Sequence, residues 1–366
     1  MPEVVYFSRF LPSTDKGGGS RRMMQIAEVL KEVTSEYELI STQLQDRLSK
    51  EVMKRIENHC VAASEKEYMF WSEKRRFPAC RLGEISREWS RQITDISRLK
   101  LVVMDDPIYF IPLFEKLKQF NIPVVGICHN LESLAAEQVA PGFQWSLFSK
   151  EIDLLAQCHM VVTISREETF LLNNMGMRPV FFPYFPVVSI STRMLQVREK
   201  RTREDKKGIL LLGNVLNLQT RQGMEKMINF WERSKLFHKH EKLIVAGYGT
   251  EKYLKNTSGN AVAFYGELAN DEMDRLVTRV RAVLCYQETG AGSLTRICEM
   301  LIAGVPVLAN SHAARSYYNM IGVHEFRELA GLPEALQRLD TINGEIPIPS
   351  PPDTACLSQK IREMLI

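Results

Sequence analysis

The stretch GAGSLTRICEMLIAGVPVLA, residues 290–309, contains the pattern that decides the fold. Its two opening glycines permit backbone angles that other residues avoid. Ser293 can cap a short helix, and Gly304 can end that helix before a buried strand at 305–309. The pattern predicts a turn, a helix and a strand. A helix start of this kind offers free N–H groups and the positive end of a dipole, which suit a phosphate.

Two charged residues of the predicted helix lie on one face. Arg296 falls in the first turn, and Glu299 follows it one turn later. A cation beside a diphosphate and a carboxylate for ribose hydroxyls would together hold a nucleotide sugar. The alternative is an ordinary turn whose Arg296 and Glu299 form an ion pair on the surface.

The same stretch resembles a known donor-site signature. GxGxxxRxxE followed by MLIAGVPVLA is similar to the signature of retaining, family-4-like glycosyltransferases with the GT-B fold. The resemblance implies donor contacts at Gly290, Gly292 and Ser293, and catalytic roles for Arg296 and Glu299. Arg296 stands where the family usually has Lys. Many members carry a second glutamate ahead of this one, with seven residues between the two, and this chain has Ala291 at that position.

Composition sets broad limits on the class of protein. The chain has 366 residues, 45% hydrophobic and 25% charged, with a net charge of +3. This length predicts two globular domains, and the near-neutral charge gives no reason to expect nucleic acid as a partner. The N-terminus lacks the layout of a signal peptide. The seven cysteines are scattered and form no disulfide or zinc pattern, so we expect a reducing cytoplasm.

Short apolar runs alternate with helical patterns along both halves of the chain. Such alternation predicts parallel sheets covered by helices. Together with the resemblance it predicts an α/β protein of the GT-B class, with two doubly wound Rossmann-like domains facing across a cleft. The predicted strands are 4–7, 37–40, 101–104, 124–128, 160–164 and 180–182 in the first half, and 209–212, 243–246, 261–265, 282–285 and 305–309 in the second.

The charged run VREKRTREDKK separates the two halves. This run has no apolar face, and we interpret 186–207 as a solvated linker. Contact of the basic residues with nucleic acid is the alternative, but the interleaved acidic residues favour the linker. The predicted domains are an acceptor-side domain at 1–185 and a donor-binding domain at 208–350. By analogy with the fold, a last helix within 351–366 would cross back to the first domain.

Two sites are predicted in the first domain. The resemblance places Gly18, Gly19 and Arg22 of KGGGSRR beside the donor phosphates, although a flexible loop with exposed basic residues is the alternative. His129 of HNLES matches a family histidine near the transferred sugar, although a hydrogen-bonded structural histidine is the alternative; Glu132 would orient it or cap the next helix.

Two further patterns in this domain favour structural roles. We interpret the pair Asp105 and Asp106 as a helix cap before Pro107, because no other metal ligand accompanies it. Ser165 reads as a helix cap, with Glu168 in the capping-box position.

The second domain carries more donor-site matches. Gly213, Asn214 and Arg221 correspond to a glycine and a basic pair that contact the diphosphate, with Asn214 replacing the first basic residue; Arg221 as a surface residue is the alternative. The turns AGYGT and FYGEL resemble those near the phosphates and the base. The residues carried over from these two turns are Gly247, Tyr265, Gly266 and Leu268.

The predicted activity is therefore a retaining, metal-independent hexosyl transfer from a UDP- or GDP-linked sugar to a glycan, lipid-linked or small-molecule acceptor, with no cofactor. Two alternatives stay open. A degenerate GT-B subunit could act as a scaffold in polysaccharide assembly, as Ala291 and Asn214 would allow. A nucleotide-sugar epimerase on the same fold would need further acid/base residues.

The segment YMFWSEKRRFP at 68–78 combines aromatic and basic residues, which suits an anionic lipid surface. A partly buried amphipathic helix explains the same pattern. The predicted location is the cytoplasm, with peripheral membrane contact left open.

Overall fold

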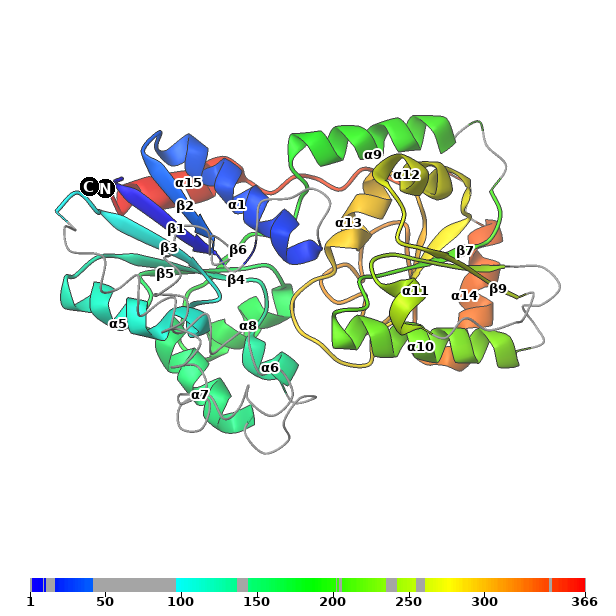
Figure 1. Cartoon of the computed structure of the whole chain (residues 1–366), viewed down its shortest axis with the longest axis horizontal. Helices are drawn as coiled ribbons and strands as arrows, with labels where there is room; N and C mark the ends of the chain where they lie inside the picture. The colour runs from blue at the N-terminus through cyan, green and yellow to red at the C-terminus, as the bar shows by residue number, and fades with distance from the viewer. Residues whose placement is uncertain are drawn as a thin grey trace. The chain divides into compact units, whose positions relative to one another are not determined.

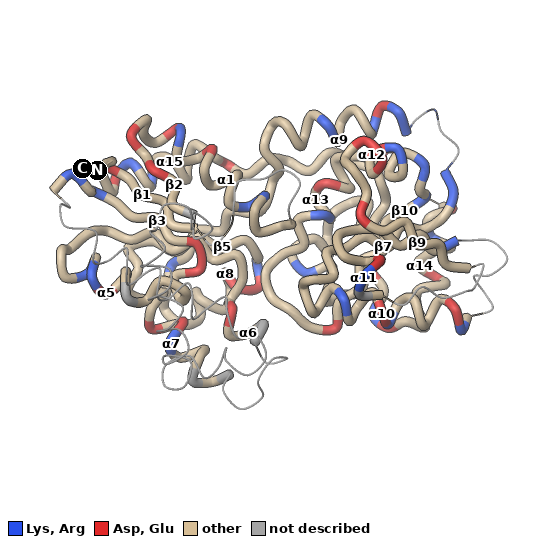
Figure 2. The backbone as a smooth tube through the Cα atoms, in the orientation of Figure 1, with Lys and Arg blue, Asp and Glu red and all other residues tan. Residues whose placement is uncertain are grey.

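The computed structural model describes residues 2–8, 10, 17–41, 97–136, 144–201, 203, 206–234, 242–254, 261–341 and 344–365. The chain divides into two compact units, Met1–Ser13 with Gly19–Pro183 and Pro352–Ile366, and Thr14–Gly18 with Tyr184–Pro351. We call these unit 1 and unit 2. The segment at 68–78 lies outside the described residues. Figure 2 shows Lys and Arg interspersed with Asp and Glu along both units, in keeping with the net charge of +3.

Unit 1 is built on a 6-stranded sheet with the order β2-β1-β3-β4-β5-β6 (Figure 1). All of its strand pairs are parallel. Parallel strands are buried on both faces, which is why they appear in the sequence as unbroken apolar runs. The elements are β1 Val4–Ser8, α1 Gly18–Val33, β2 Tyr37–Ser41, β3 Leu101–Asp105, η2 Pro107–Phe110, α5 Ile111–Gln119, β4 Val124–Cys128, α6 Glu132–Ala136, α7 Gln144–Leu155, β5 Met160–Thr163, α8 Arg166–Asn174, β6 Val180–Phe181 and α15 Thr354–Glu363.

The last helix, α15, packs on unit 1 beside α1 (Figure 1). Leu357 and Ile361 of α15 are buried in the same core cluster as Ile26 and Leu30 of α1. The Ser358 hydroxyl donates to the Glu32 carboxylate at 2.9 Å. The end of the chain therefore completes the covering of the first sheet.

Unit 2 is built on a second 6-stranded sheet with the order β12-β11-β10-β7-β8-β9. Its pairs are also parallel, so the carboxyl ends of all these strands meet at one edge. The elements are α9 Val188–Arg201, β7 Ile209–Leu212, α10 Leu218–Arg233, β8 Leu243–Ala246, α11 Thr250–Tyr253, β9 Val262–Gly266, α12 Asn270–Arg279, β10 Ala282–Cys285, α13 Thr295–Ile302, β11 Val307–Asn310, β12 Val323–Phe326, η3 Leu329–Gly331, α14 Leu332–Arg338 and η4 Leu339–Thr341.

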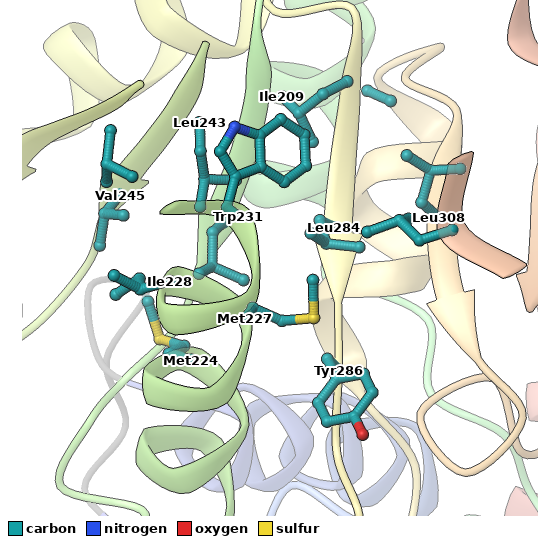
Figure 3. Close-up of a cluster of buried hydrophobic side chains, with 14 of the residues drawn as sticks. Ile209, Met224, Met227, Ile228, Trp231, Leu243, Val245, Leu284, Tyr286 and Leu308 are labelled. Carbon is teal, nitrogen blue, oxygen red and sulfur yellow. The ribbon is translucent and has the colours of Figure 1, made fainter. Parts of the chain in front are cut away.

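The core on one face of this sheet forms around α10. Trp231 is fully buried and lies among aliphatic side chains of β7, β8 and β10 (Figure 3). Met227 lies one turn before it and Met224 two turns before it, and both fill the space beside it. Gly223 allows this close packing, because a Cβ there would lie 2.1 Å from the carbonyl oxygen of Tyr286.

The predicted linker at 186–207 is wrong over most of its length. Val188–Arg201 forms helix α9, and Ile190, Met194 and Val197 are buried along one side of it. Their spacing is helical, so this charged stretch does have an apolar face. It belongs to unit 2, whose boundary with unit 1 lies at Pro183–Tyr184.

Candidate functional site

The strand order of unit 2 creates a switch point between β7 and β10. These strands are neighbours, and the chain continues from β7 toward β8 on one side and from β10 toward β11 on the other. In open α/β sheets ligands bind outside the carboxyl ends of the strands at such a point. Gly213 follows β7 here, and the loop containing Gly290 and Gly292 follows β10.

The turn at Gly290–Gly292 is held by two side chains from the loop after β11. Gly290 and Gly292 have φ angles of 123° and 71°, which only glycine adopts readily. His312 Nε2 lies 3.0 Å from the Gly290 carbonyl oxygen. Arg315 donates to the carbonyls of Ala291 and Gly292, each at 2.7 Å.

The orientation of these carbonyls determines where the backbone N–H groups point. Described peptide bonds are all trans, and in a planar trans peptide the C=O and the following N–H point in opposite directions. The N–H groups of Ala291, Gly292 and Ser293 are therefore directed away from Arg315 and His312. Successive N–H groups on one side of a turn make a concavity that attracts an anion.

Helix α13 begins directly after this turn. Its N-cap is Leu294, whose side chain cannot accept a hydrogen bond, so the prediction that Ser293 caps the helix is wrong. Ser293 instead belongs to the turn. The predicted end is confirmed, because the helix stops at Ile302 and Gly304 has a left-handed φ of 69°.

Arg296 and Glu299 occupy different environments on α13. Arg296 is half-buried, and its Nε atom is buried without a hydrogen-bond partner among the described residues. Its Nη1 atom lies 3.8 Å from the point where a Cβ on Gly213 would stand. Glu299 is 3% exposed, and it accepts a hydrogen bond of 2.7 Å from the Tyr184 phenol. A buried Glu299 is inconsistent with the surface ion pair.

Gly213 leaves no room for a side chain, since a Cβ there would lie 2.5 Å from Thr220 Cγ2. Asn214 folds back and accepts from the Leu216 N–H at 3.0 Å. Arg221 is half-buried in the first turn of α10, which Asn217 caps. The structure thus places the predicted diphosphate residues at the end of β7.

Gly247, after β8, packs against the loop after β7. Its φ is 125°, and a Cβ there would lie 2.1 Å from the Gly213 carbonyl oxygen. Gly266 ends β9 with a φ of 73°. Tyr265 is exposed, and Leu268 is half-buried before α12. These glycines keep the strand ends close together.

A second set of contacts fixes the loop before the turn. Asn310, at the end of β11, accepts from the Gln287 N–H at 3.0 Å and donates to the Gln287 carbonyl at 2.6 Å. Arg315 Nη1 donates to the Gln287 side chain at 3.1 Å. Asn310, His312, Arg315 and Tyr184 were not predicted, because their contacts join segments that are distant in the sequence.

Unit 1 has a polar cluster at its own switch point, where β1 lies between β2 and β3. Asp105 is fully buried and accepts from the Tyr6 phenol at 2.7 Å and from the Ser8 hydroxyl. Its Oδ1 atom lies 3.0 Å from His129 Nε2. Burial, and then Asp105, raise the pKa of Tyr6 well above its ordinary value, so the phenol remains a donor.

Asp106 also contacts His129. It has a left-handed φ of 45° and stands at the N-cap of η2. Its carboxylate accepts from the His129 backbone N–H at 2.9 Å. The predicted cap before Pro107 is confirmed in position for Asp106, but its side chain makes no capping hydrogen bond, and both carboxylates contact His129 instead.

Three glutamates hold the loop that follows His129. Glu132 accepts from the Tyr109 phenol at 2.7 Å and begins α6. Glu151 accepts from the backbone N–H groups of Glu132 and Ser133. Burial raises the pKa of Glu151 to about 8.

Glu168 accepts from the Leu131 N–H at 2.8 Å and from the Ser165 hydroxyl. Ser165 caps α8 by accepting from the Glu168 N–H, as predicted.

The glycine-rich segment opens α1. Gly18 and Gly19 are its first two residues, and a Cβ on Gly19 would collide with the Phe10 ring at 2.3 Å. The Phe10 ring also lies 4.8 Å from the His129 ring. Arg22 is fully buried and donates to Gln25 at 2.6 Å, with its guanidinium over the Phe182 ring. Arg22 thus links α1 to the segment after β6.

Comparisons with known proteins identify the architecture. Sucrose-phosphate synthase from Thermosynechococcus elongatus superposes with a TM-score of 0.58 at 14% identity, covering 99% of this chain and 93% of that one. HepE from Anabaena, in complex with UDP-glucose, gives 0.59 at 13% identity, covering 100% and 99%. Trehalose 6-phosphate synthase from Burkholderia multivorans gives 0.60 at 10% identity, covering 100% and 92%.

The chain has the GT-B fold. The three solved structures named above are glycosyltransferases. No protein-family model matches the sequence, and no curated protein matches it either. Identities this low establish the architecture alone.

The described residues contain no group of three or more His, Cys, Asp or Glu side chains arranged to hold a metal ion. No helix in the described part is long and apolar enough to cross a membrane.

Proposed function

We propose that the chain is a glycosyltransferase that moves a sugar from a nucleotide-diphosphate donor to an acceptor hydroxyl, with retention of the anomeric configuration and without a metal ion. The observation that carries the proposal is the turn at Gly290–Gly292. Its carbonyls are tied to His312 and Arg315, so its N–H groups point to the opposite side, beside the start of α13.

The charge of the leaving group supports this assignment. When the bond between the anomeric carbon and the phosphate oxygen breaks, the diphosphate takes the electron pair and gains negative charge. Preoriented N–H groups, a helix N-terminus and a nearby cation stabilise such charge at no further cost of reorganisation. The turn, α13 and Arg296 supply all three, which is why we propose a metal-independent reaction.

The acceptor chemistry follows from the same leaving group. The acceptor oxygen forms the new bond to the anomeric carbon, and its proton passes to the phosphate oxygen that has just left. Attack from the side of the leaving group gives retention. We propose that Glu299, held by Tyr184, binds the ribose hydroxyls, and that His129, held by Asp105 and Asp106, contacts the transferred sugar.

Donor binding and turnover test the proposal. Thermal shift and hydrolysis assays with UDP- and GDP-linked sugars should reveal a donor that stabilises the protein and is consumed. Glu299→Gln should weaken donor binding, whereas Glu225→Gln, an exposed carboxylate on α10, should not. Unchanged donor binding in Glu299→Gln would contradict the site assignment.

A second candidate function rests on Ala291, which stands where the resembling family often has a glutamate. A GT-B protein without this carboxylate could bind a nucleotide sugar as a scaffold subunit and leave it intact. Donor binding without hydrolysis or transfer to any glycan, lipid-linked or small-molecule acceptor would favour that function.

A further inference from the structure

A pocket lies at the end of β9, the edge strand of the second sheet. It has a volume of about 400 Å³ and is lined by Glu251, Leu254, Phe264, Tyr265, Gly266 and Glu267. β9 ends at Gly266, so the pocket opens at the carboxyl edge of the sheet, where the glycine turn also lies.

The distance between this pocket and the glycine turn matches the length of one nucleotide. The sheet order places β7 and β8 between β10 and β9. Strands are about 4.8 Å apart, so the ends of β10 and β9 are separated by about 14 Å. A diphosphate at the turn after β10 can therefore extend along the strand ends and reach the pocket with its base.

The lining combines an aromatic wall with carboxylates. Leu254 is buried, Phe264 is half-buried, and the Tyr265 ring is 53% exposed. Glu251 accepts from the Glu267 backbone N–H at 3.2 Å, which fixes its carboxylate beside Gly266. The Glu267 side chain is exposed, and the lining includes no cation.

The carboxylates decide among the bases, because an ionised carboxylate only accepts hydrogen bonds. Guanine presents two adjacent donors on its Watson–Crick edge, the N1–H and the 2-amino group, which together match one carboxylate. Uracil has a single N3–H between two carbonyl oxygens that a carboxylate repels. Adenine and cytosine place a ring acceptor beside their amino group.

We propose that this pocket selects guanine through Glu267, with Glu251 as the second carboxylate, so that the donor is a GDP-linked sugar. The inference rests on the proposed function and deepens it. A bidentate contact between a side chain and a base edge discriminates by about 5- to 150-fold.

Calorimetric titration of the full chain with GDP, IDP, ADP and UDP at one salt concentration tests the proposal. GDP should bind at least about fivefold more tightly than UDP or ADP. IDP lacks the 2-amino group and should fall between GDP and UDP. Glu267→Gln should reduce GDP affinity and leave UDP affinity unchanged, with Glu251→Gln showing a smaller effect in the same direction.

The controls separate this inference from the function on which it rests. Glu225→Gln removes an exposed carboxylate outside the pocket and should preserve the order of the four affinities. Equal or tighter binding of UDP or ADP would overturn the choice of guanine while leaving the proposed function intact. A preference for GDP that survives both pocket substitutions would overturn the role of the carboxylates. Binding of none of the four nucleotides would contradict the proposed function as well.

Discussion

Replacing Arg315 should loosen the glycine turn without unfolding unit 2. This side chain donates to the carbonyls of Ala291, Gly292 and His312 and to the Gln287 side chain. Glutamine at this position is shorter and offers one amide group, so Arg315→Gln would keep at most one of these four contacts.

The size of the effect follows from the contacts that are lost. An intramolecular hydrogen bond contributes about 0.5–1.5 kcal/mol net, and one from a charged donor more. Arg315 is half-buried, and water can reach some of the carbonyls that lose it, so we take about 0.7–1 kcal/mol for each of the three lost bonds. The turn should then open about 2–3 kcal/mol more easily, which corresponds to a factor of about 30 to 150 in the opening equilibrium.

Amide hydrogen exchange measures this opening directly and needs no donor. The peptide covering Gln287–Leu294 should exchange about 30- to 150-fold faster in Arg315→Gln, while peptides from the sheet core keep their rates. Arg275→Gln is the matched control, because Arg275 forms an exposed ion pair with Asp271 on α12. Such pairs contribute at most about 1 kcal/mol. If the turn peptide of Arg315→Gln exchanges at the same rate as in the unmodified protein, the Arg315 contacts do not hold the turn closed.

Four further predictions concern the remaining site contacts. Tyr184→Phe removes the hydrogen bond to the buried Glu299 carboxylate and should raise the KM for the donor by about 10- to 100-fold in steady-state kinetics. An unchanged KM would show that this carboxylate does not bind the donor. Asp105→Asn removes the charge beside His129, the predicted catalytic histidine, and should lower kcat while the donor affinity measured by calorimetry stays the same. A loss of donor affinity with an unchanged kcat would contradict the proposed role of His129. Burial, and then Arg315, lower the pKa of His312 below 6.5, so the folded state binds fewer protons than the unfolded state. The melting temperature should therefore fall as the pH drops below about 6.5. His312→Gln should make the melting temperature depend less on pH in this range, and an equally steep dependence would contradict the prediction. Burial raises the pKa of Glu151 to about 8 from 4.5, so the folded protein should lose stability as the pH rises from 4.5 toward 8, on the order of 5 kcal/mol in all. Glu151→Gln should remove that loss in urea unfolding at several pH values, and the same pH dependence in the variant would contradict this account.

The strands could be predicted because their burial is visible in the sequence. Val124–Cys128, Ile209–Leu212, Leu243–Ala246 and Ala282–Cys285 have the predicted bounds, and each is a short apolar run. The edge strand β12, Val323–Phe326, was missed. Three of its four residues are only half-buried, so it lacks the unbroken apolar pattern of a central strand.

The charged stretch near the start of unit 2 could not be predicted as a helix, for a different reason. Arg198 donates to the carbonyls of Leu301 and Ile302 at the end of α13. Arg201 donates to the carbonyls of Val277 and Val280 at the end of α12, and burial lowers its pKa to about 10. Cations that satisfy the last carbonyls of a helix are favourable, but their partners lie far away in the sequence. Charge alone therefore cannot distinguish a solvated linker from a helix docked by its arginines.

The residues of the candidate site also differ in whether the sequence could predict them. Glycines with a left-handed φ, such as Gly290 and Gly292, can be predicted because no other residue suits the turn. The residues that orient the turn cannot be predicted, because a hydrogen bond from Arg315 or His312 to a carbonyl that is distant in the sequence leaves no local pattern. Strand order has the same property. Gly213 and the turn become neighbours only because β10 pairs with β7, and that pairing places both at the switch point, where open α/β sheets bind ligands.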